Sequence, residues 1–305
     1  MQSIDNQILL YVFEFCKSWL SGKAGFVVQT SGSTGTPKTI EVSRKQMEAS
    51  VKMSQKAFNW QGGEKALLSL PTQFIGGKMM LVRAMMLDWH IYLQESSANP
   101  FAHLSEPFDF LSFTPYQIQN ILEKSPEKVF LLNQAKNIIL GGASLSNNLE
   151  NIIQNTLQSP VYHTYAMTET LSHIAIRRIN GNNNSEWFEV LEGVKIRLDN
   201  RQCLCITSPS TEYKELISND LAEIKQERYF KVLGRVDNII NSGGIKISLE
   251  SIEKVAEEIW EDLKLSYRYF CAGIADEYLG QKLVLVVECK KLSDEQENKI
   301  LTMLS

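Results

Sequence analysis

The sequence predicts an α/β fold in which a large N-terminal domain is followed by a small α+β domain. Strand-like and helix-like segments alternate from residue 25 to residue 165, which predicts mostly parallel strands with covering helices. Short alternating strands follow from about residue 174 and predict a small antiparallel sheet or barrel. The length of 305 residues also exceeds the usual size of one domain. We therefore expect domains at residues 1–234 and 235–305.

The chain begins with a segment of helical periodicity. Ile4, Ile8, Val12, Phe15 and Trp19 recur on one helical face, and a glycine ends the segment. Its apolar part is too short to span a membrane, and no basic leader surrounds it. We expect a helix that packs on the core, with no signal peptide and no membrane partner.

The alternating region contains three loops that follow strands. Strands are expected at 25–28, 66–70, 90–93, 108–114, 137–140 and 161–165, and helices at 78–87, after Pro115 and from Ser146, with Ser43 and Gln46 forming a capping box before another. The loops are 29–39, 141–144 and 166–170. Because ligands bind beyond the carboxyl ends of parallel strands, we expect functional residues in these loops.

The C-terminal part has a different pattern. Strands are expected at 174–178, 187–190, 194–198, 202–207, 268–274 and 282–288, with a helix at 249–263. Ser293 and Gln296 form another capping box, yet the sequence ends about three helical turns later. A helix opened in this way at the terminus suggests that the chain has been cut short.

Composition restricts the class of protein. Hydrophobic residues make up 44%, charged residues 22%, and the net charge is −4, which describes a globular protein and argues against a nucleic-acid groove. The five cysteines are scattered and lack a C-x-x-C pair. Cys203 and Cys205 alternate along an expected strand, so we interpret them as packed side chains. This cysteine usage favours a reduced cytoplasmic setting.

Residues 29–39 are the most informative loop. They hold the sequence QTSGSTGTPKT, in which hydroxyl side chains, glycines and one lysine are concentrated. Glycines allow backbone amides to approach a phosphate, and hydroxyls and lysine add donors and charge. A flexible surface loop is the alternative, but the loop is short and lies between two structured segments. Pro37 replaces the second glycine of a Walker P-loop and removes an amide donor, which disfavours a P-loop NTPase.

Four separated segments together resemble the acyl-adenylating superfamily. They are residues 30–38, residues 165–170 (YAMTET), Asp220 followed by residues 234–237 (GRVD), and residues 240–247 (INSGGIKI). Within this superfamily the chain most resembles the o-succinylbenzoate–CoA ligases of menaquinone biosynthesis. Ser172 and His173 follow the third strand-end loop much as in those ligases, and Arg83 falls where they carry a basic residue suited to the succinyl carboxylate.

The resemblance implies an acid–CoA ligase that uses ATP, Mg2+ and coenzyme A. A carboxylate attacks the α-phosphorus of ATP, and the thiol of CoA then displaces AMP from the acyl-adenylate. By resemblance, the β- and γ-phosphates would be held by Thr30, Ser31, Gly32, Ser33, Thr34, Gly35 and Lys38. Thr168 would contact the α-phosphate and Glu169 would hold Mg2+. The remaining nucleotide residues would be Gly142, Ala143, Tyr165, Asp220 and Arg235.

The resemblance also implies a moving C-terminal domain and an acid subsite. Asp237 would be the hinge, and Gly243 and Gly244 would border the path of CoA. The residues suggested for the acid are Arg83, Phe74, Gly141, Ser172 and His173. Ordinary structural roles stay open for these residues: a surface arginine, a packed histidine, a core tyrosine at 165, and a plain turn at 243–244.

Two departures from the family leave alternatives open. Only about 28 residues precede the phosphate loop, and no C-terminal lysine has the usual Gly-Lys context. The chain is therefore also compatible with a fragment that binds nucleotide but adenylates poorly, or with a nucleotide-binding protein without catalysis. A ligase for another aryl or fatty acid is a further alternative. The sequence leaves the oligomeric state open.

Overall fold

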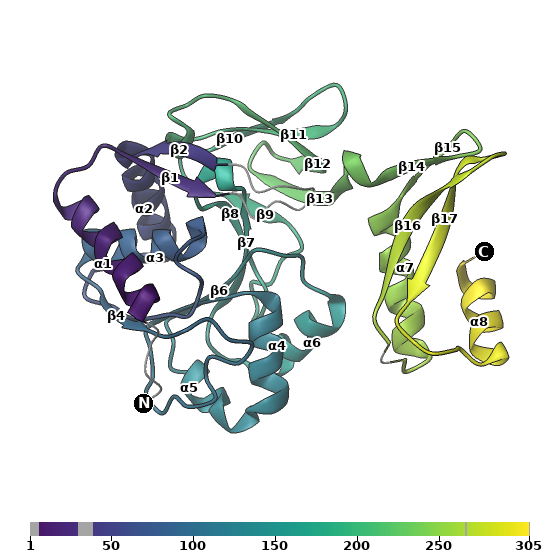
Figure 1. The fold of residues 1–305 in the computed structure, drawn as a ribbon, viewed down its shortest axis with the longest axis horizontal. Coiled ribbons are helices and arrows are strands. Elements are labelled where there is room, and N and C mark those ends of the chain that lie inside the picture. The colour runs from purple at the N-terminus through teal and green to yellow at the C-terminus, as the bar shows by residue number, and fades with distance from the viewer. Residues whose placement is uncertain (1–5, 30–38, 266, 305) are drawn as a thin grey trace. The chain divides into compact units, whose positions relative to one another are not determined.

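The computed structural model describes residues 6–29, 39–265 and 267–304. This part of the chain forms two compact units (Figure 1). The first comprises Met1–Lys195 and Ile206–Leu216, and the second comprises Ile196–Cys205 and Ile217–Ser305. This division into units does not test the domain boundary predicted at residue 234, which stays a prediction.

The first unit is built around strands that alternate with helices, as the sequence predicts. Its elements are α1 (Asn6–Leu20), β1 (Gly25–Gln29), β2 (Thr39–Ser43), α2 (Arg44–Phe58), β3 (Lys65–Leu68), α3 (Ile75–Leu87), β4 (His90–Leu93), β5 (Phe110–Phe113), α4 (Pro115–Lys124), η1 (Pro126–Lys128), α5 (Val129–Leu132), β6 (Asn137–Leu140), α6 (Asn147–Thr156), β7 (Val161–Ala166), η2 (Thr168–Thr170), β8 (His173–Arg178), β9 (Phe188–Val190) and η3 (Pro209–Thr211). Strands β10 (Lys195–Leu198) and β11 (Cys203–Thr207) include residues of both units. Cys203 and Cys205 are buried in β11, which confirms their interpretation as packed side chains.

The large sheet is parallel over β7, β6, β5, β3 and β4, in that order. Strands β8 and β9 continue it with antiparallel pairing. Helices α2 and α3 lie on one face of the sheet and α4–α6 on the other (Figure 1). Ile139 of β6 packs in the core beside α2 and α3, whereas its neighbours Ile138 and Leu140 pack in the core beside α4–α6. Two covered faces explain why these strands are continuous apolar runs.

Local signals in the sequence place several helix ends correctly. The Ser43 side chain accepts from the Gln46 amide at 3.1 Å, and the Ser43 amide donates to Gln46 Oε1 at 2.8 Å. The same reciprocal pair forms between Ser293 and Gln296 before α8. Each box satisfies two backbone amide donors at a helix start, so the predicted capping boxes are confirmed.

One strand differs from its predicted setting. We expected Gly25–Val28 to join the parallel sheet, with the loop at 29–39 lying beyond its carboxyl end. Strand β1 instead pairs antiparallel with β2 in a separate two-stranded ladder, in which Gln29 faces Thr39. A single parallel bridge joins Gln29 to Phe74. The expectation was wrong because a short apolar run does not reveal which strand will pair with it.

The second unit contains a ladder and an α+β subdomain. Its elements are β12 (Leu216–Lys225), β13 (Tyr229–Arg235), η4 (Val236–Asn238), β14 (Ile239–Ser242), β15 (Ile245–Ser248), α7 (Leu249–Asp262), β16 (Tyr269–Asp276), β17 (Gly280–Val287) and α8 (Asp294–Leu304). Four strands form an antiparallel sheet in the order β15-β14-β17-β16. Ala256, Ile259, Trp260 and Ile300 form the core between the two helices and this sheet.

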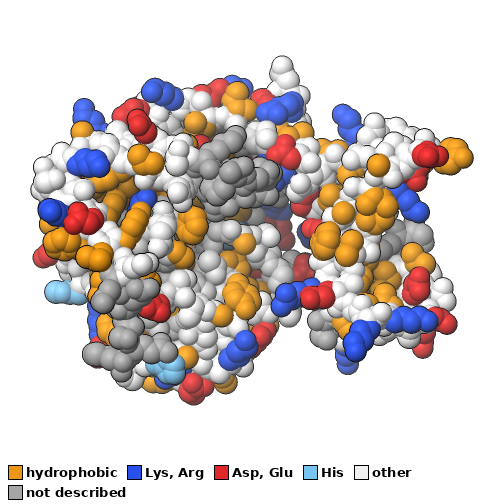
Figure 2. All heavy atoms as spheres, viewed as in Figure 1, with side chains coloured by type: hydrophobic (Ala, Val, Ile, Leu, Met, Phe, Trp, Pro, Cys, Tyr) orange, Lys and Arg blue, Asp and Glu red, His pale blue; other side chains and the backbone are white. Residues whose placement is uncertain are grey.

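The described surface is mixed in charge. Lysine and arginine side chains alternate with aspartate and glutamate over the face shown in Figure 2. Within the described residues, no helix has the length and apolar character required to cross a membrane. All five cysteines are free thiols.

Candidate functional site

The predicted phosphate loop lies outside the described residues. This applies to Thr30, Ser31, Gly32, Ser33, Thr34, Gly35 and Lys38. The residues on either side of the loop are described: β1 ends at Gln29, β2 begins at Thr39, and the two residues face each other in the ladder. The two described residues that flank positions 30–38 are therefore paired with each other.

The glycine turn after β6 requires its glycines. A Cβ atom at Gly141 would lie 2.6 Å from Thr164 Oγ1, and Gly142 has a φ of +86°. The first contact is shorter than packed atoms allow, and the second backbone conformation favours glycine. Thr164 Oγ1 donates to the Leu140 carbonyl at 3.0 Å, so β7 is held closely against this turn. Packing against Thr164 accounts for the glycine at 141, and the approach of this turn to a nucleotide stays a prediction.

The turn after β7 places Thr168 and Glu169 at the carboxyl end of a neighbouring strand. Thr170 Oγ1 accepts from the Met167 amide at 3.0 Å and is 2.9 Å from the Ser172 carbonyl, to which it can donate. Thr170 is buried, whereas Glu169 is exposed. The buried threonine thus holds the turn and leaves the glutamate carboxylate at the surface, where it can reach a ligand.

The exposed carboxylate of Glu169 suits a magnesium ion. Mg2+ usually binds one or two protein carboxylates and completes its shell with water and phosphate oxygens. Within the described residues, no group of three or more His, Cys, Asp or Glu side chains is arranged to hold a metal ion. Glu169 therefore fits a metal ion that is bound together with a phosphate ligand. The described residues do not form a site in which protein side chains alone coordinate a metal ion.

Tyr165 lies at the end of β7 and is nearly buried. Its ring packs edge-on against Phe188, with centroids 6.0 Å apart. Phe188 also packs against His163 at 5.1 Å. The structure therefore shows the packing role that the sequence left open for Tyr165, and the adenine contact stays a prediction.

His163 connects the glycine turn to a partly buried ion pair. Its Nε2 is 3.1 Å from the Ala143 carbonyl, and its Nδ1 is 3.2 Å from Arg177 Nε. Arg177 in turn pairs with Glu150 of α6 through two contacts, of which Nη1–Oε2 is 3.1 Å. None of these three residues was predicted from the sequence. Glu150 and Arg177 come from separate elements 27 residues apart, and no local pattern relates them.

Burial keeps His163 neutral. Desolvation and the charge of Arg177 lower its pKa to about 4, although the hydrogen bond to Ala143 acts in the opposite direction. The unfolded chain has an ordinary histidine pKa near 6.5, so between these values it binds a proton that the folded chain excludes. The stability that neutral His163 contributes is therefore complete above pH 6.5 and is lost as the pH falls toward 4.

This shift predicts a pH-dependent stability. Between pH 7 and pH 4.5, the wild-type chain should lose about 2 kcal/mol more unfolding free energy than His163→Gln, whose side chain does not titrate. Urea unfolding at the two pH values measures the difference. Equal losses in the two proteins would contradict the prediction.

A second hydrogen-bonded chain connects Arg83 to the histidine after the Thr-Glu-Thr segment. Arg83 Nη2 donates to Ser172 Oγ at 2.6 Å, and Ser172 Oγ is 3.3 Å from His173 Nδ1. His173 Nε2 is 3.0 Å from Ser54 Oγ, which donates to the Ser50 carbonyl at 3.0 Å. Arg83, Ser172 and His173 were predicted to share a subsite, and the fold brings them together; Ser54 of α2 was missed.

Arg83 is buried with its charge uncompensated among the described residues. Its side chain is 2% exposed, and its Nε has no hydrogen-bond partner there. Nη1 contacts the Met80 sulfur at 3.7 Å, and the guanidinium lies 5.8 Å from the Trp60 ring centroid. Burial lowers the pKa of Arg83 to about 10. The alternative of a surface arginine is therefore wrong, because α3 is surrounded by core on this side.

His173 and Phe74 have different settings. His173 is 2% exposed and packs edge-on against Phe58, so the packing alternative holds for this residue. Desolvation, and then the charge of Arg83, lowers its pKa well below the usual value. Phe74 is 40% exposed at the start of α3. A role for Phe74 as a pocket wall stays a prediction.

The second unit contains the predicted Asp220, Arg235 and Asp237. Asp220 faces Arg235 in the β12–β13 ladder. Arg235 Nη1 is 3.0 Å from Asp220 Oδ1, and its Nη2 is 2.8 Å from Asp237 Oδ2. The hydrogen bond from Arg235 is the largest influence that lowers the pKa of Asp237. One guanidinium thus organises both carboxylates.

Two residues that were not predicted from the sequence support this group. Asn219 Nδ2 donates to both oxygens of Asp237 at 3.1 Å. Glu250 accepts from the Arg235 amide at 3.2 Å. Asp237 lies in the short η4 turn between β13 and β14, which is a suitable place for a hinge.

Gly243 and Gly244 form the two-residue turn between β14 and β15. Both have positive φ, at +60° and +89°, as such hairpin turns require. The Gly243 amide donates to the Leu279 carbonyl at 2.9 Å. The turn alone accounts for both glycines, and their role beside CoA stays a prediction.

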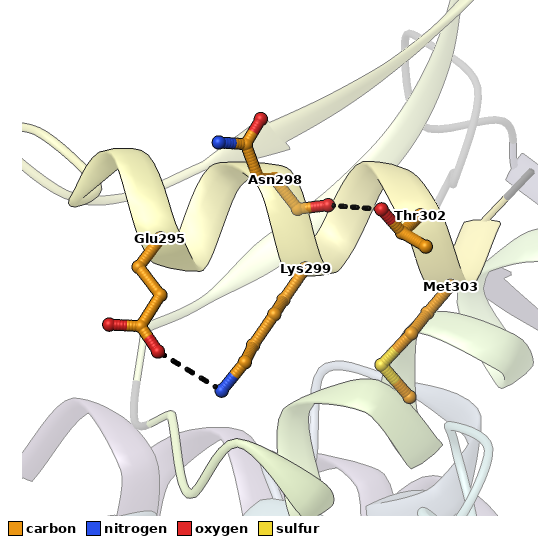
Figure 3. Close-up of a pocket in the computed structure, with 5 residues that line it drawn as sticks. All are labelled: Glu295, Asn298, Lys299, Thr302 and Met303. Carbon is orange, nitrogen blue, oxygen red and sulfur yellow. Dashed lines mark hydrogen bonds and ion pairs between the residues drawn. The ribbon is translucent and has the colours of Figure 1, made fainter.

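A shallow hollow lies along α8 in the second unit (Figure 3). Lys299 Nζ is 3.3 Å from Glu295 Oε1, and Thr302 Oγ1 donates to the Asn298 carbonyl at 2.7 Å. These contacts join neighbours along one helix, and none of the predicted site residues lines the hollow. It adds no group to the candidate site.

Comparison with known proteins identifies the family. The family model of the AMP-binding enzymes matches residues 23–194. The 2-succinylbenzoate–CoA ligase of Staphylococcus epidermidis is 25% identical over 287 residues, a match that covers 85% of this chain and 58% of the relative. That of Haemophilus influenzae is 25% identical over 245 residues, covering 74% and 52%. The chain therefore spans little more than half the length of these relatives.

Solved structures agree with this result. An acyl-CoA synthetase (AMP-forming)/AMP-acid ligase II-like protein from Dyadobacter fermentans is 39% identical with a TM-score of 0.72, and the match covers 99% of this chain and 86% of that chain. The o-succinylbenzoate CoA synthetase of Bacillus subtilis, in complex with an acyl-adenylate intermediate, has a TM-score of 0.72 at 19% identity; the match covers 92% of this chain and 62% of that one, and it shows the fold alone. The resemblance inferred from four sequence segments is confirmed, and the chain belongs to the AMP-binding enzyme family.

Proposed function

We propose that the protein activates a carboxylic acid with Mg-ATP as an acyl-adenylate and transfers the acyl group to coenzyme A. An o-succinylbenzoate-type acid is the proposed substrate. The observation that carries the substrate class is Arg83, a buried guanidinium whose described oxygen partner is the neutral Ser172 hydroxyl. A buried cation is costly unless a counter-charge joins it, so this position favours a ligand that brings its own carboxylate.

The first step transfers the adenylyl group. A carboxylate oxygen of the acid attacks the α-phosphorus of ATP, and pyrophosphate leaves with the electron pair of the broken bond. We assign Thr168 to the α-phosphate, Glu169 to Mg2+, and Lys38 with the residues of the 30–38 loop to the leaving phosphates. When bound, Mg2+ neutralises the charge of the phosphate oxygens. The protein contributes orientation and preset charge, which are the main requirements of such a step.

The remaining assignments concern the nucleotide and the second step. Tyr165 would lie against the adenine, and Gly142 and Ala143 would let the backbone approach the nucleotide. Asp220 with Arg235 would hold the ribose hydroxyls. In the second step the CoA thiolate attacks the acyl carbonyl, and AMP leaves. We assign Asp237 to the hinge between these steps and Gly243 and Gly244 to the path of the thiol.

Arg83 would take the carboxylate that is not activated. A guanidinium binds a carboxylate through two parallel hydrogen bonds, and Nε together with one Nη is a suitable pair. Nε has no partner among the described residues, and Nη2, on the same edge of the guanidinium, carries two N–H groups of which one donates to Ser172. Ser172 and the His173–Ser54 chain would hold the guanidinium in place, and Phe74 and Gly141 would line the acid subsite.

Pyrophosphate exchange tests this proposal. The chain is incubated with labelled pyrophosphate, Mg-ATP and one of three acids: o-succinylbenzoate, benzoate or a medium-chain fatty acid. We expect exchange with o-succinylbenzoate at a rate at least tenfold above that with the acids that have one carboxylate. Equal or faster exchange with either of those acids would reject the substrate class. Nucleotide binding without exchange for any acid would reject catalysis and favour a nucleotide-binding protein.

A further inference from the structure

The carbonyl of Ala143 is held by a side chain whose tautomer is determined by its neighbours. Arg177 Nε can only donate, so His163 Nδ1, at 3.2 Å, must accept. The proton of the neutral ring therefore lies on Nε2, which is 3.1 Å from the Ala143 carbonyl and donates to it. His163 is buried, and its pKa of about 4 keeps it neutral at physiological pH.

Arg177 is itself held from three sides. Glu150 accepts from two of its nitrogens, Nη1 is 3.4 Å from the Ser185 carbonyl, and the guanidinium lies 5.5 Å from the Phe188 ring centroid. The ion pair is largely shielded from water, with side chains 11% and 20% exposed. Screening is weak at such a site, so the pair can hold the arginine in one orientation.

These contacts hold both ends of one short segment, residues 143–150. Ala143 lies just after β6, and Glu150 lies in the first turn of α6, whose N-cap Ser146 accepts from the Leu149 amide at 3.1 Å. The segment between them is therefore anchored to β7 through His163 and to β8 through Arg177. A trans peptide is planar, so a carbonyl turned toward His163 directs the following Ser144 amide away from it.

We propose that Glu150, Arg177 and His163 form a positioning relay that presets the backbone of the 141–144 turn for nucleotide binding. The three residues act through the Ala143 carbonyl and do not touch the nucleotide themselves. This inference rests on the proposed function, because it assigns the turn the task of meeting the nucleotide. The relay lowers the cost of ordering the turn when the ligand binds.

Two substitutions at His163 separate positioning from packing. His163→Phe keeps a ring against Phe188 but removes the donor and the acceptor, whereas His163→Gln keeps a neutral donor and acceptor. We expect His163→Phe to weaken AMP binding about tenfold, as the loss of one organising hydrogen bond would. The KM for ATP should rise by a similar factor while kcat changes less. His163→Gln should stay within about threefold of the wild type.

Calorimetry with AMP, steady-state kinetics with ATP, and nitrogen NMR of labelled histidine provide the measurements. The NMR spectrum should show His163 protonated at Nε2 in the wild type, a result that does not depend on activity. His103→Gln, at an exposed histidine, is the matched control and should bind AMP as the wild type does. Glu150→Gln keeps a partner for Arg177 and should show a smaller loss of affinity than His163→Phe.

The outcomes distinguish the relay from the proposed function. A wild-type chain that does not bind AMP would reject the proposed function and the relay with it. Normal AMP binding by His163→Phe, or a proton on Nδ1, would reject the relay while leaving the proposed function intact. A larger loss in His163→Gln than in His163→Phe would show that ring packing against Phe188, and not the hydrogen bond, is what matters, and would also overturn the relay.

Discussion

Glu169→Gln should reduce pyrophosphate exchange by about 10²–10³-fold, a factor typical of removing one group that stabilises the charge of a transition state. The substitution removes the negative charge from the proposed magnesium ligand but keeps its shape. Glu169 is exposed on a turn held by the buried Thr170, so the fold should be unaffected. The initial exchange rate with o-succinylbenzoate and Mg-ATP measures the loss.

Two further measurements make this result specific. A weakened metal site should recover part of the rate when the Mg2+ concentration is raised, because mass action refills it. Glu127→Gln removes the same charge from another exposed turn and should exchange at the wild-type rate. Exchange by Glu169→Gln at the wild-type rate would remove Glu169 from the mechanism.

Arg83→Met should separate substrate recognition from stability. Loss of a buried guanidinium–carboxylate contact commonly costs about 2–5 kcal/mol, so kcat/KM for o-succinylbenzoate should fall about 10²–10³-fold. The folded protein should be equally or more stable. Methionine fills a similar volume, and it does not bury a charge as Arg83 does, whose described oxygen partner is the Ser172 hydroxyl. Thermal unfolding and exchange kinetics on the same samples measure both effects.

The choice of acid is the internal control for Arg83. Any slow exchange with benzoate should change little in Arg83→Met, because that acid has no second carboxylate. Arg83→Lys should recover only part of the rate, since an ammonium cannot reproduce the planar fork of the guanidinium. Equal losses with both acids, or a clear drop in melting temperature, would assign Arg83 to the structure and not to the substrate.

Some of the structural features behind these predictions could be predicted from the sequence, and others could not. The turns at 141–144 and 166–170 were placed correctly, because an apolar run that ends in glycine or polar residues is a local signal of a strand end. The capping boxes at Ser43 and Ser293 were also found, since each depends on residues only three positions apart. The 30–38 loop was identified by its composition and lies outside the described residues.

Features that depend on distant partners were missed or wrongly placed. The pairing of β1 with β2 could not be distinguished from entry into the large sheet, because both leave the same alternating pattern. The burial of Arg83 contradicts the usual expectation for arginine and required the surrounding core to be known. Glu150, Arg177 and His163 are unremarkable in the sequence, and only the packing of α6, β7 and β8 makes them one group.

The sequence by itself determined the alternation of strands and helices and the positions of the turns that carry the proposed site residues, and the resemblance of four of its segments indicated the family. The alternation and the turns follow from local chemistry: periodicity, caps, glycines and hydroxyls close together in the chain. The tertiary structure alone decided which charges are buried, which carbonyl is held by His163, and that Arg235 joins Asp220 to Asp237. Burial and pairing depend on segments far apart in the chain. Their contributions to the free energy of folding arise only when those segments come into contact.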